Sequence, residues 1–177
     1  SQLIETPLRH AEWVNPFTAL ERAAAGIGHG NILTDSDGVA RALTLRETDD
    51  EGAARWALAV EALRVGEGLK IDEVRDVPDA VQVGARQIPI ETTLPTIGFD
   101  QAEGKTEQFR ASRMTLDFVG PTGSFAVRTY SLADVVDGKI EPERLRGKYV
   151  LIGATAAAMG DRVASPFVGF ATADGNQ

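Results

Sequence analysis

The feature that most constrains the fold is an uninterrupted apolar run at residues 149–152, which reads Tyr-Val-Leu-Ile. Such a run is typical of a strand that is covered on both faces, as in a parallel or mixed sheet with helices on each side. Three small residues, Gly153, Ala154 and Thr155, follow it at the position where open α/β sheets bind ligands. We therefore expect an α/β or α+β fold, with a mixed β-sheet flanked by helices.

Three helices are predicted from apolar spacing and from residues that favour helix ends. The first covers about 16–24 after Asn15, and the second covers about 52–65. Trp56, Val60 and Leu63 form an apolar stripe on the second helix. Leu58, Ala62 and Val65 widen this stripe, which predicts burial over much of the helix circumference. A short third helix at 132–137 is expected to be capped by Ser131.

Two β-hairpins are predicted, at about 30–46 and about 113–129. The first turns at residues 35–38, where an Asp-rich sequence ends in the glycine that a tight turn favours. The second turns at residues 121–123, between strands that alternate apolar and polar residues. Residues 98–110 are polar and show no period, which predicts a loop.

Charge and cysteine content exclude several classes of function. The 177 residues contain no cysteine, which removes thiol catalysis, cysteine-ligated metal and disulfides. The formal net charge of −8 disfavours binding to nucleic acid or to anionic membrane surfaces. The length corresponds to a single domain, with residues 170–177 as a tail.

His10 and His29 are the two histidines that could act as bases near neutral pH. His29 lies between Gly28 and Gly30, where backbone can approach a ligand closely. A catalytic role would need a nucleophile and an orienting carboxylate, and spacing identifies neither. The residue pattern favours a histidine that hydrogen-bonds locally.

The acidic turn and the late small-residue loop are candidate ligand sites with simpler structural explanations. Asp35 and Asp37 begin like a calcium loop, but the later ligands of such a loop are missing, which favours a plain turn. Asp161 could bring a carboxylate to the edge of the sheet, or it could pair with Arg41 or Arg128. No metal and no cofactor is predicted.

Two stretches together resemble a known family. One spans 26–41, with Gly-Ile-Gly-His-Gly-Asn followed by the acidic turn and Arg41, and the other spans 116–166 and includes Leu-Ile-Gly-Ala-Thr at 151–155. The order of these pieces is similar to the type-two CHASE domain, the cyclase and histidine-kinase associated sensory extracellular module. The resemblance covers about 15–169, and it implies that an N-terminal part of the family domain is missing.

The resemblance implies a sensor role. The chain would be the periplasmic or extracellular input domain of a bacterial inner-membrane receptor, anchored by segments outside residues 1–177. The cytoplasmic output would be an adenylate or diguanylate cyclase, a two-component histidine kinase or a serine/threonine kinase, while the sensor itself is not an enzyme. Gly38 and Gly153 are characteristic of the family, and so are the ligand-binding candidates His29, Asn31, Asp35, Asp37, Arg41, Thr155 and Asp161.

Two other functions remain open at this point. One is a hydrolase or transferase with Asp161, His29 and Thr155 in one site, which requires these side chains to converge. The other is a structural dimerisation module that buries a large apolar interface. For the sensor, we expect an unidentified small-molecule or protein stimulus, a homodimer, and no nucleic-acid partner.

Overall fold

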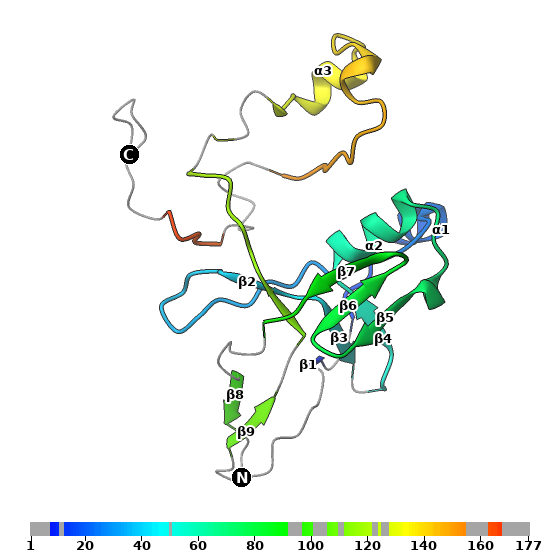
Figure 1. Ribbon diagram of the computed structural model, residues 1–177. Coiled ribbons are helices and arrows are strands. Elements are labelled where there is room, and N and C mark those ends of the chain that lie inside the picture. Colours follow the sequence, from blue (N-terminus) through cyan, green and yellow to red (C-terminus); the bar gives the residue numbers. More distant parts are fainter. Residues whose placement is uncertain are drawn as a thin grey trace. The chain divides into compact units, whose positions relative to one another are not determined.

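The chain is described by a computed structural model over residues 8–10, 13–49, 51–91, 97–100, 106–109, 112–121, 124, 128–154 and 163–167. For strands β1, β8 and β9 the description is of the backbone alone. The chain divides into two compact units, and Figure 1 labels the helices and strands described below. Unit 1 comprises Ser1–Leu33 and Ala42–Leu116, and unit 2 comprises Thr34–Arg41 and Asp117–Gln177.

The chain contains both helices and strands, so the predicted mixture of α and β structure is confirmed. The helices are α1 (Thr18–Ala23), α2 (Leu58–Gly66) and α3 (Leu132–Val136), with short 3-10 turns η1 (Ile71–Glu73) and η3 (Pro142–Arg144). The strands are β1 (Leu8–His10), β2 (Ala42–Thr44), β3 (Arg46–Asp49), β4 (Ala54–Trp56), β5 (Val74–Val77), β6 (Ala80–Val83), β7 (Arg86–Pro89), β8 (Ile97–Asp100), β9 (Thr106–Phe109) and β10 (Arg113–Thr115).

The strands that the structure describes in unit 1 form four small sheets rather than one continuous sheet. The sheet orders are β1-β3-β4, β10-β2, β5-β6-β7 and β8-β9, and every pairing is antiparallel except β1 with β3. The β5–β6 turn places Pro78 before Asp79, whose φ of 59° suits the third position of a type II turn. Pro89 lies on the edge strand β7, where its missing N–H leaves no ladder position empty.

The core of unit 1 forms where α2 packs on the β5-β6-β7 sheet. Val60 of α2 shares one buried cluster with Leu45, Ala57, Val74, Val81 and Val83. The prediction that α2 is buried on much of its circumference is wrong, because Leu58 is 52% exposed and Val65 is 38% exposed. The helix also begins later than expected, since β4 occupies residues 54–56 and pairs with β3.

The helix ends agree with the predicted positions better than with the predicted caps. Helix α1 lies inside the expected range, but its N-cap is Phe17 rather than Asn15. Ser131 is the N-cap of α3, as expected, without a side-chain hydrogen bond to the helix. The backbone of Gly138, with φ of 70°, ends α3 in the conformation that glycine favours.

The first predicted hairpin keeps its turn but not its strand pairing. The turn closes through an Asp35 N–H to Val39 carbonyl bond of 2.9 Å. Residues 30–34 form no strand, while β2 pairs with β10 from the second predicted hairpin. Residues 125–127, the expected partner of β10, lie outside the described residues, and the predicted loop at 98–110 instead contributes to the β8-β9 hairpin.

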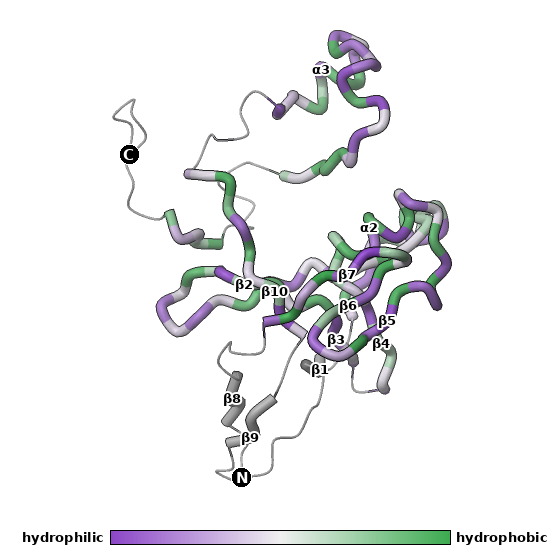
Figure 2. Tube along the Cα trace, viewed as in Figure 1, coloured by the Kyte–Doolittle hydropathy of each residue, from purple (hydrophilic) through white to green (hydrophobic). Residues whose placement is uncertain are grey.

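Unit 2 contains α3, η3 and the apolar run at 149–152. The run is not a covered strand, because its four side chains are between 52% and 85% exposed. It appears as a hydrophobic stretch of chain after η3 (Figure 2). No described strand pairs with it, and four apolar residues cannot form a buried strand without a neighbouring strand to satisfy their backbone groups.

Candidate functional site

Backbone hydrogen bonds fix the position of the segment around His29. The His29 N–H donates to the Trp56 carbonyl at 2.9 Å, and the Leu58 N–H donates to the His29 carbonyl at 2.8 Å. A Cβ atom at Gly28 would lie 2.5 Å from Leu58 Cα. Gly28 therefore permits a close approach between two backbone segments of this chain, which explains it without a ligand.

His29 belongs to a buried polar cluster in unit 1. The His29 side chain is 1% exposed and the Glu47 side chain is 0% exposed, with 3.8 Å between His29 Nδ1 and Glu47 Oε2. Asn31 donates a hydrogen bond of 2.6 Å from Nδ2 to the same Glu47 oxygen. Two residues predicted from sequence, His29 and Asn31, thus meet at a carboxylate that sequence reasoning did not identify.

Trp13 and Arg55 extend this cluster toward solvent. The Trp13 ring stacks on the His29 ring with centroids 6.2 Å apart and an interplanar angle of 23°. The Arg55 guanidinium lies 4.8 Å from the Trp13 ring centroid and donates to Asn15 Oδ1 at 2.6 Å. The cluster therefore ties the segment at 13–15 to strands β3 and β4.

Glu61 and Arg64 of α2 form an ion pair next to the chain that precedes His29. Arg64 contacts Glu61 through two hydrogen bonds of 2.9 and 2.5 Å, and it also donates to the carbonyls of Leu69 and Ala25. The hydrogen bond to Glu61 raises the pKa of Arg64. These contacts fasten α2 to the chain on both sides of it, which is a structural role.

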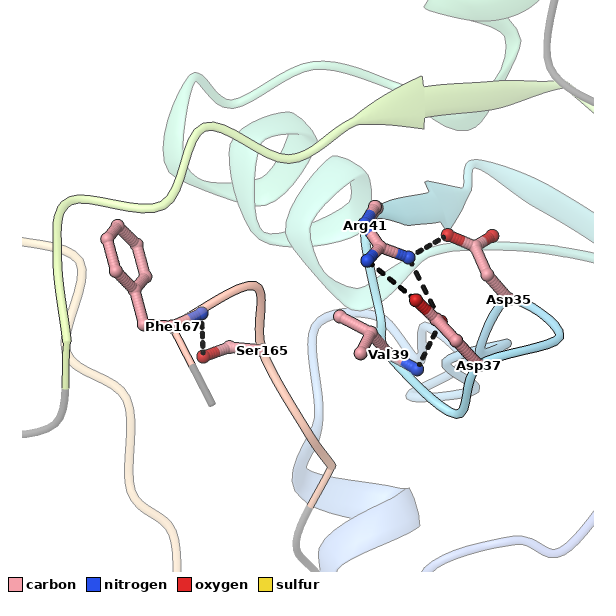
Figure 3. Close-up of polar contacts among 6 residues, drawn as sticks. All are labelled: Asp35, Asp37, Val39, Arg41, Ser165 and Phe167. Carbon is pink, nitrogen blue, oxygen red and sulfur yellow. Dashed lines mark hydrogen bonds and ion pairs between the residues drawn. The ribbon is translucent and has the colours of Figure 1, made fainter. Parts of the chain in front are cut away.

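In unit 2, Asp35, Asp37 and Arg41 form one ion-pair cluster across the turn (Figure 3). Arg41 donates to Asp35 at 2.8 Å and to both oxygens of Asp37, at 3.0 and 2.8 Å. The hydrogen bond from Arg41, with a second from the Val39 N–H, lowers the pKa of Asp37 to about 2. The two aspartates in turn raise the pKa of Arg41.

This ion-pair cluster supports the interpretation of 35–38 as a turn. The guanidinium lies between the two carboxylates that a calcium ion would need, so Arg41 provides the positive charge there. The following residues add a backbone contact, since the Ala40 N–H donates to the Ala164 carbonyl at 2.8 Å. Ser165 Oγ accepts from the Phe167 N–H at 3.4 Å (Figure 3).

The seven predicted ligand-binding candidates fall into three sets. His29 and Asn31 lie in the buried cluster of unit 1. The second set is the ion-pair cluster of unit 2, formed by Asp35, Asp37 and Arg41. Thr155 and Asp161 lie outside the described residues, so the convergence of Asp161, His29 and Thr155 that an enzyme requires stays a prediction.

The residues that sequence reasoning missed are Glu47 and Trp13. Glu47 lies in the strand Arg46–Asp49, where every residue is polar, so no apolar alternation marks its buried face. Trp13 lies before α1 and outside any regular element. No spacing or motif in the sequence marks either residue as a neighbour of His29.

Two kinds of feature are absent from the described ranges. No group of three histidine or acidic side chains there is arranged to hold a metal ion. No helix in that part of the chain is long and apolar enough to cross a membrane.

Comparison with known proteins gives one family. The CHASE2 domain model matches residues 2–175. Neither the curated proteins nor the solved structures give a match.

Proposed function

The chain belongs to the CHASE2 domain family, which is a family of extracellular sensory domains, and from this premise we propose the role that follows. Residues 1–177 form the periplasmic signal-input domain of a bacterial inner-membrane receptor. The domain binds a small-molecule or protein stimulus and passes the signal to a cytoplasmic cyclase or kinase. The observation that carries this proposal is the family match over residues 2–175.

The side-chain chemistry supports a binding role rather than catalysis by this chain. In the ion-pair cluster of unit 2, Arg41 pairs with both aspartates. The buried cluster of unit 1, as described, contains no serine, threonine or lysine nucleophile among His29, Asn31, Glu47, Trp13 and Arg55. A sensor needs two states with different affinity for its stimulus, and it does not need a nucleophile and base.

A reporter fusion in the membrane-anchored receptor tests the cellular location. A phosphatase that is active only in the periplasm, fused after residue 177, should be active, while a fluorescent protein that folds only in the cytoplasm should be dark. The opposite pattern would overturn the periplasmic location. The same two reporters fused to the output domain serve as the control and should give the reverse result.

Native mass spectrometry of the 177-residue chain tests stimulus binding and subunit count together. A non-covalent adduct that is lost on gentle activation would support small-molecule sensing and give the mass of the ligand. We also propose a homodimer, supported by the apolar run at 149–152, where Leu151 is 85% exposed. A dimer weakened by Leu151→Asp but not by Val14→Asp, at a position 96% exposed in unit 1, would agree with this interface.

A further inference from the structure

The buried contact between His29 and Glu47 has a property that a sensory role alone does not require. The two side chains are 1% and 0% exposed, and their nearest polar atoms are 3.8 Å apart. A histidine changes charge near pH 6.5, close to the pH at which many proteins work. A buried carboxylate beside it favours the charged imidazole, because an isolated buried charge is costly and an ion pair is less so.

We propose that the His29–Glu47 pair is a proton-responsive anchor for the segment at 13–15. As the pH falls through the range in which histidine titrates, the pair takes up one proton and fastens this segment to strands β3 and β4.

The Trp13 ring connects His29 to the segment at 13–15. That ring stacks on the imidazole with centroids 6.2 Å apart, and an indole attracts a protonated imidazole more strongly than a neutral one. Trp13 Nε1 also donates to the Ala53 carbonyl at 3.3 Å, in the turn that joins β3 to β4. A change of charge on His29 therefore acts on a ring that bridges two parts of unit 1.

The other charged groups around His29 do not reverse this direction. Arg55 of β4 reaches the cluster through the Trp13 ring, 4.8 Å from its centroid, whereas Glu47 of β3 faces the imidazole directly. Helix α2 begins beside His29 and carries Glu61, which already pairs with Arg64 at 2.5 Å. The Glu47 carboxylate thus lies 3.8 Å from the imidazole and favours its charged form.

The sign of the stability effect follows from this pairing. A pair that holds its proton more tightly when folded stabilises the fold at low pH, and the contribution is lost as the pH rises through the folded-state titration. For each pH we compare the folding equilibrium constant of the native chain with that of His29→Asn. We expect the ratio of the native value to the variant value to be about fivefold larger at pH 5.5 than at pH 8. His10→Asn is the matched control and should show no such pH dependence relative to the native chain.

Fluorescence of Trp13 gives a readout that a purely structural histidine would not change. The chain contains two tryptophans, so Trp56→Phe leaves Trp13 as the single emitter. A protonated imidazole quenches a stacked indole, so emission should fall between pH 8 and pH 5 with a single midpoint. Adding Glu47→Gln should move that midpoint to lower pH, because the favourable carboxylate is removed.

The fluorescence titrations of the native chain and the variants decide between the possible results. A titration that disappears with His29→Asn and persists with His10→Asn supports the anchor. Emission that is flat with pH, or a titration that survives His29→Asn, overturns it. If His29→Asn does not fold, the C–H resonances of the two histidines of the folded native chain give the same answer, since a His29 resonance that does not shift between pH 8 and pH 5 excludes proton uptake there.

Discussion

The two units use their apolar residues in opposite ways. Unit 1 buries Leu45, Val60 and Val81 in one cluster beneath α2. Unit 2 leaves Leu151 85% exposed and Ile152 77% exposed, although they belong to the uninterrupted apolar run at 149–152. Hydrophobicity therefore favours burial of a side chain, but a neighbouring strand or helix decides whether burial occurs.

The units differ in the same way in their polar contacts. Glu47 in unit 1 has a side chain that is 0% exposed and is held by Asn31 at 2.6 Å. Asp37 in unit 2 has a side chain that is 51% exposed and pairs with Arg41 at 2.8 Å. Changes in unit 1 should therefore alter stability, whereas changes in unit 2 should mainly alter local electrostatics.

A matched pair of leucine truncations gives the largest expected effect. Leu45→Ala should lower the free energy of unfolding by about 2–5 kcal/mol, because it leaves a cavity in the core of unit 1. Leu151→Ala should change it by less than about 0.5 kcal/mol, because that side chain is already exposed. Chemical unfolding followed by tryptophan fluorescence measures both.

Both tryptophans lie in unit 1, so circular dichroism should follow the same unfolding as a control for unit 2. An equal loss of stability in Leu45→Ala and Leu151→Ala would contradict the contrast between the units. It would mean that residue 151 is buried in solution.

A pair of glycine substitutions should give an intermediate effect. Gly28→Ala should destabilise the chain by about 1–3 kcal/mol, because the new Cβ would lie 2.5 Å from Leu58 Cα and the backbone must shift. Gly30→Ala is the control two residues away, where no atom lies within 4 Å of the new Cβ. Thermal unfolding measures the stability of both variants. A larger loss of stability in Gly30→Ala than in Gly28→Ala would refute the close approach.

The smallest expected effect concerns the pH dependence of the turn in unit 2. Because the folded-state pKa of Asp37 is lowered from 3.8 to about 2, its contribution to stability is present above pH 4 and is lost as the pH falls through about 2. Arg41→Gln should return the pKa of Asp37 toward 3.8, since the guanidinium is the largest cause of the shift.

Carboxyl resonances measured from pH 6 to pH 1.5 follow this titration directly. Arg146→Gln, elsewhere in unit 2, is the control and should leave Asp37 unchanged. A midpoint near 3.8 in the native chain would show that the ion pair of Arg41 with Asp37 does not form in solution.

Local signals in the sequence predicted the parts of the fold that depend on a few neighbouring residues. The Asp-rich turn at 35–38 and the start of α3 after Ser131 both follow from the preferences of the residues at those positions. His29 and Asn31 were identified through the resemblance to a sensor family, and they do meet in one cluster. Glu47 escaped notice because a polar strand carries no sign of which face is buried.

By itself the sequence determined the class of the fold, the family and the turn at 35–38, since these depend on composition, order and short-range geometry. The tertiary structure alone decided which strands pair, which apolar stripe of α2 is covered, and which carboxylate meets His29. Strand pairing joins β2 to β10 across about seventy residues, and one polar strand can present either face to the core. Such choices depend on every available partner at once, so no local pattern encodes them.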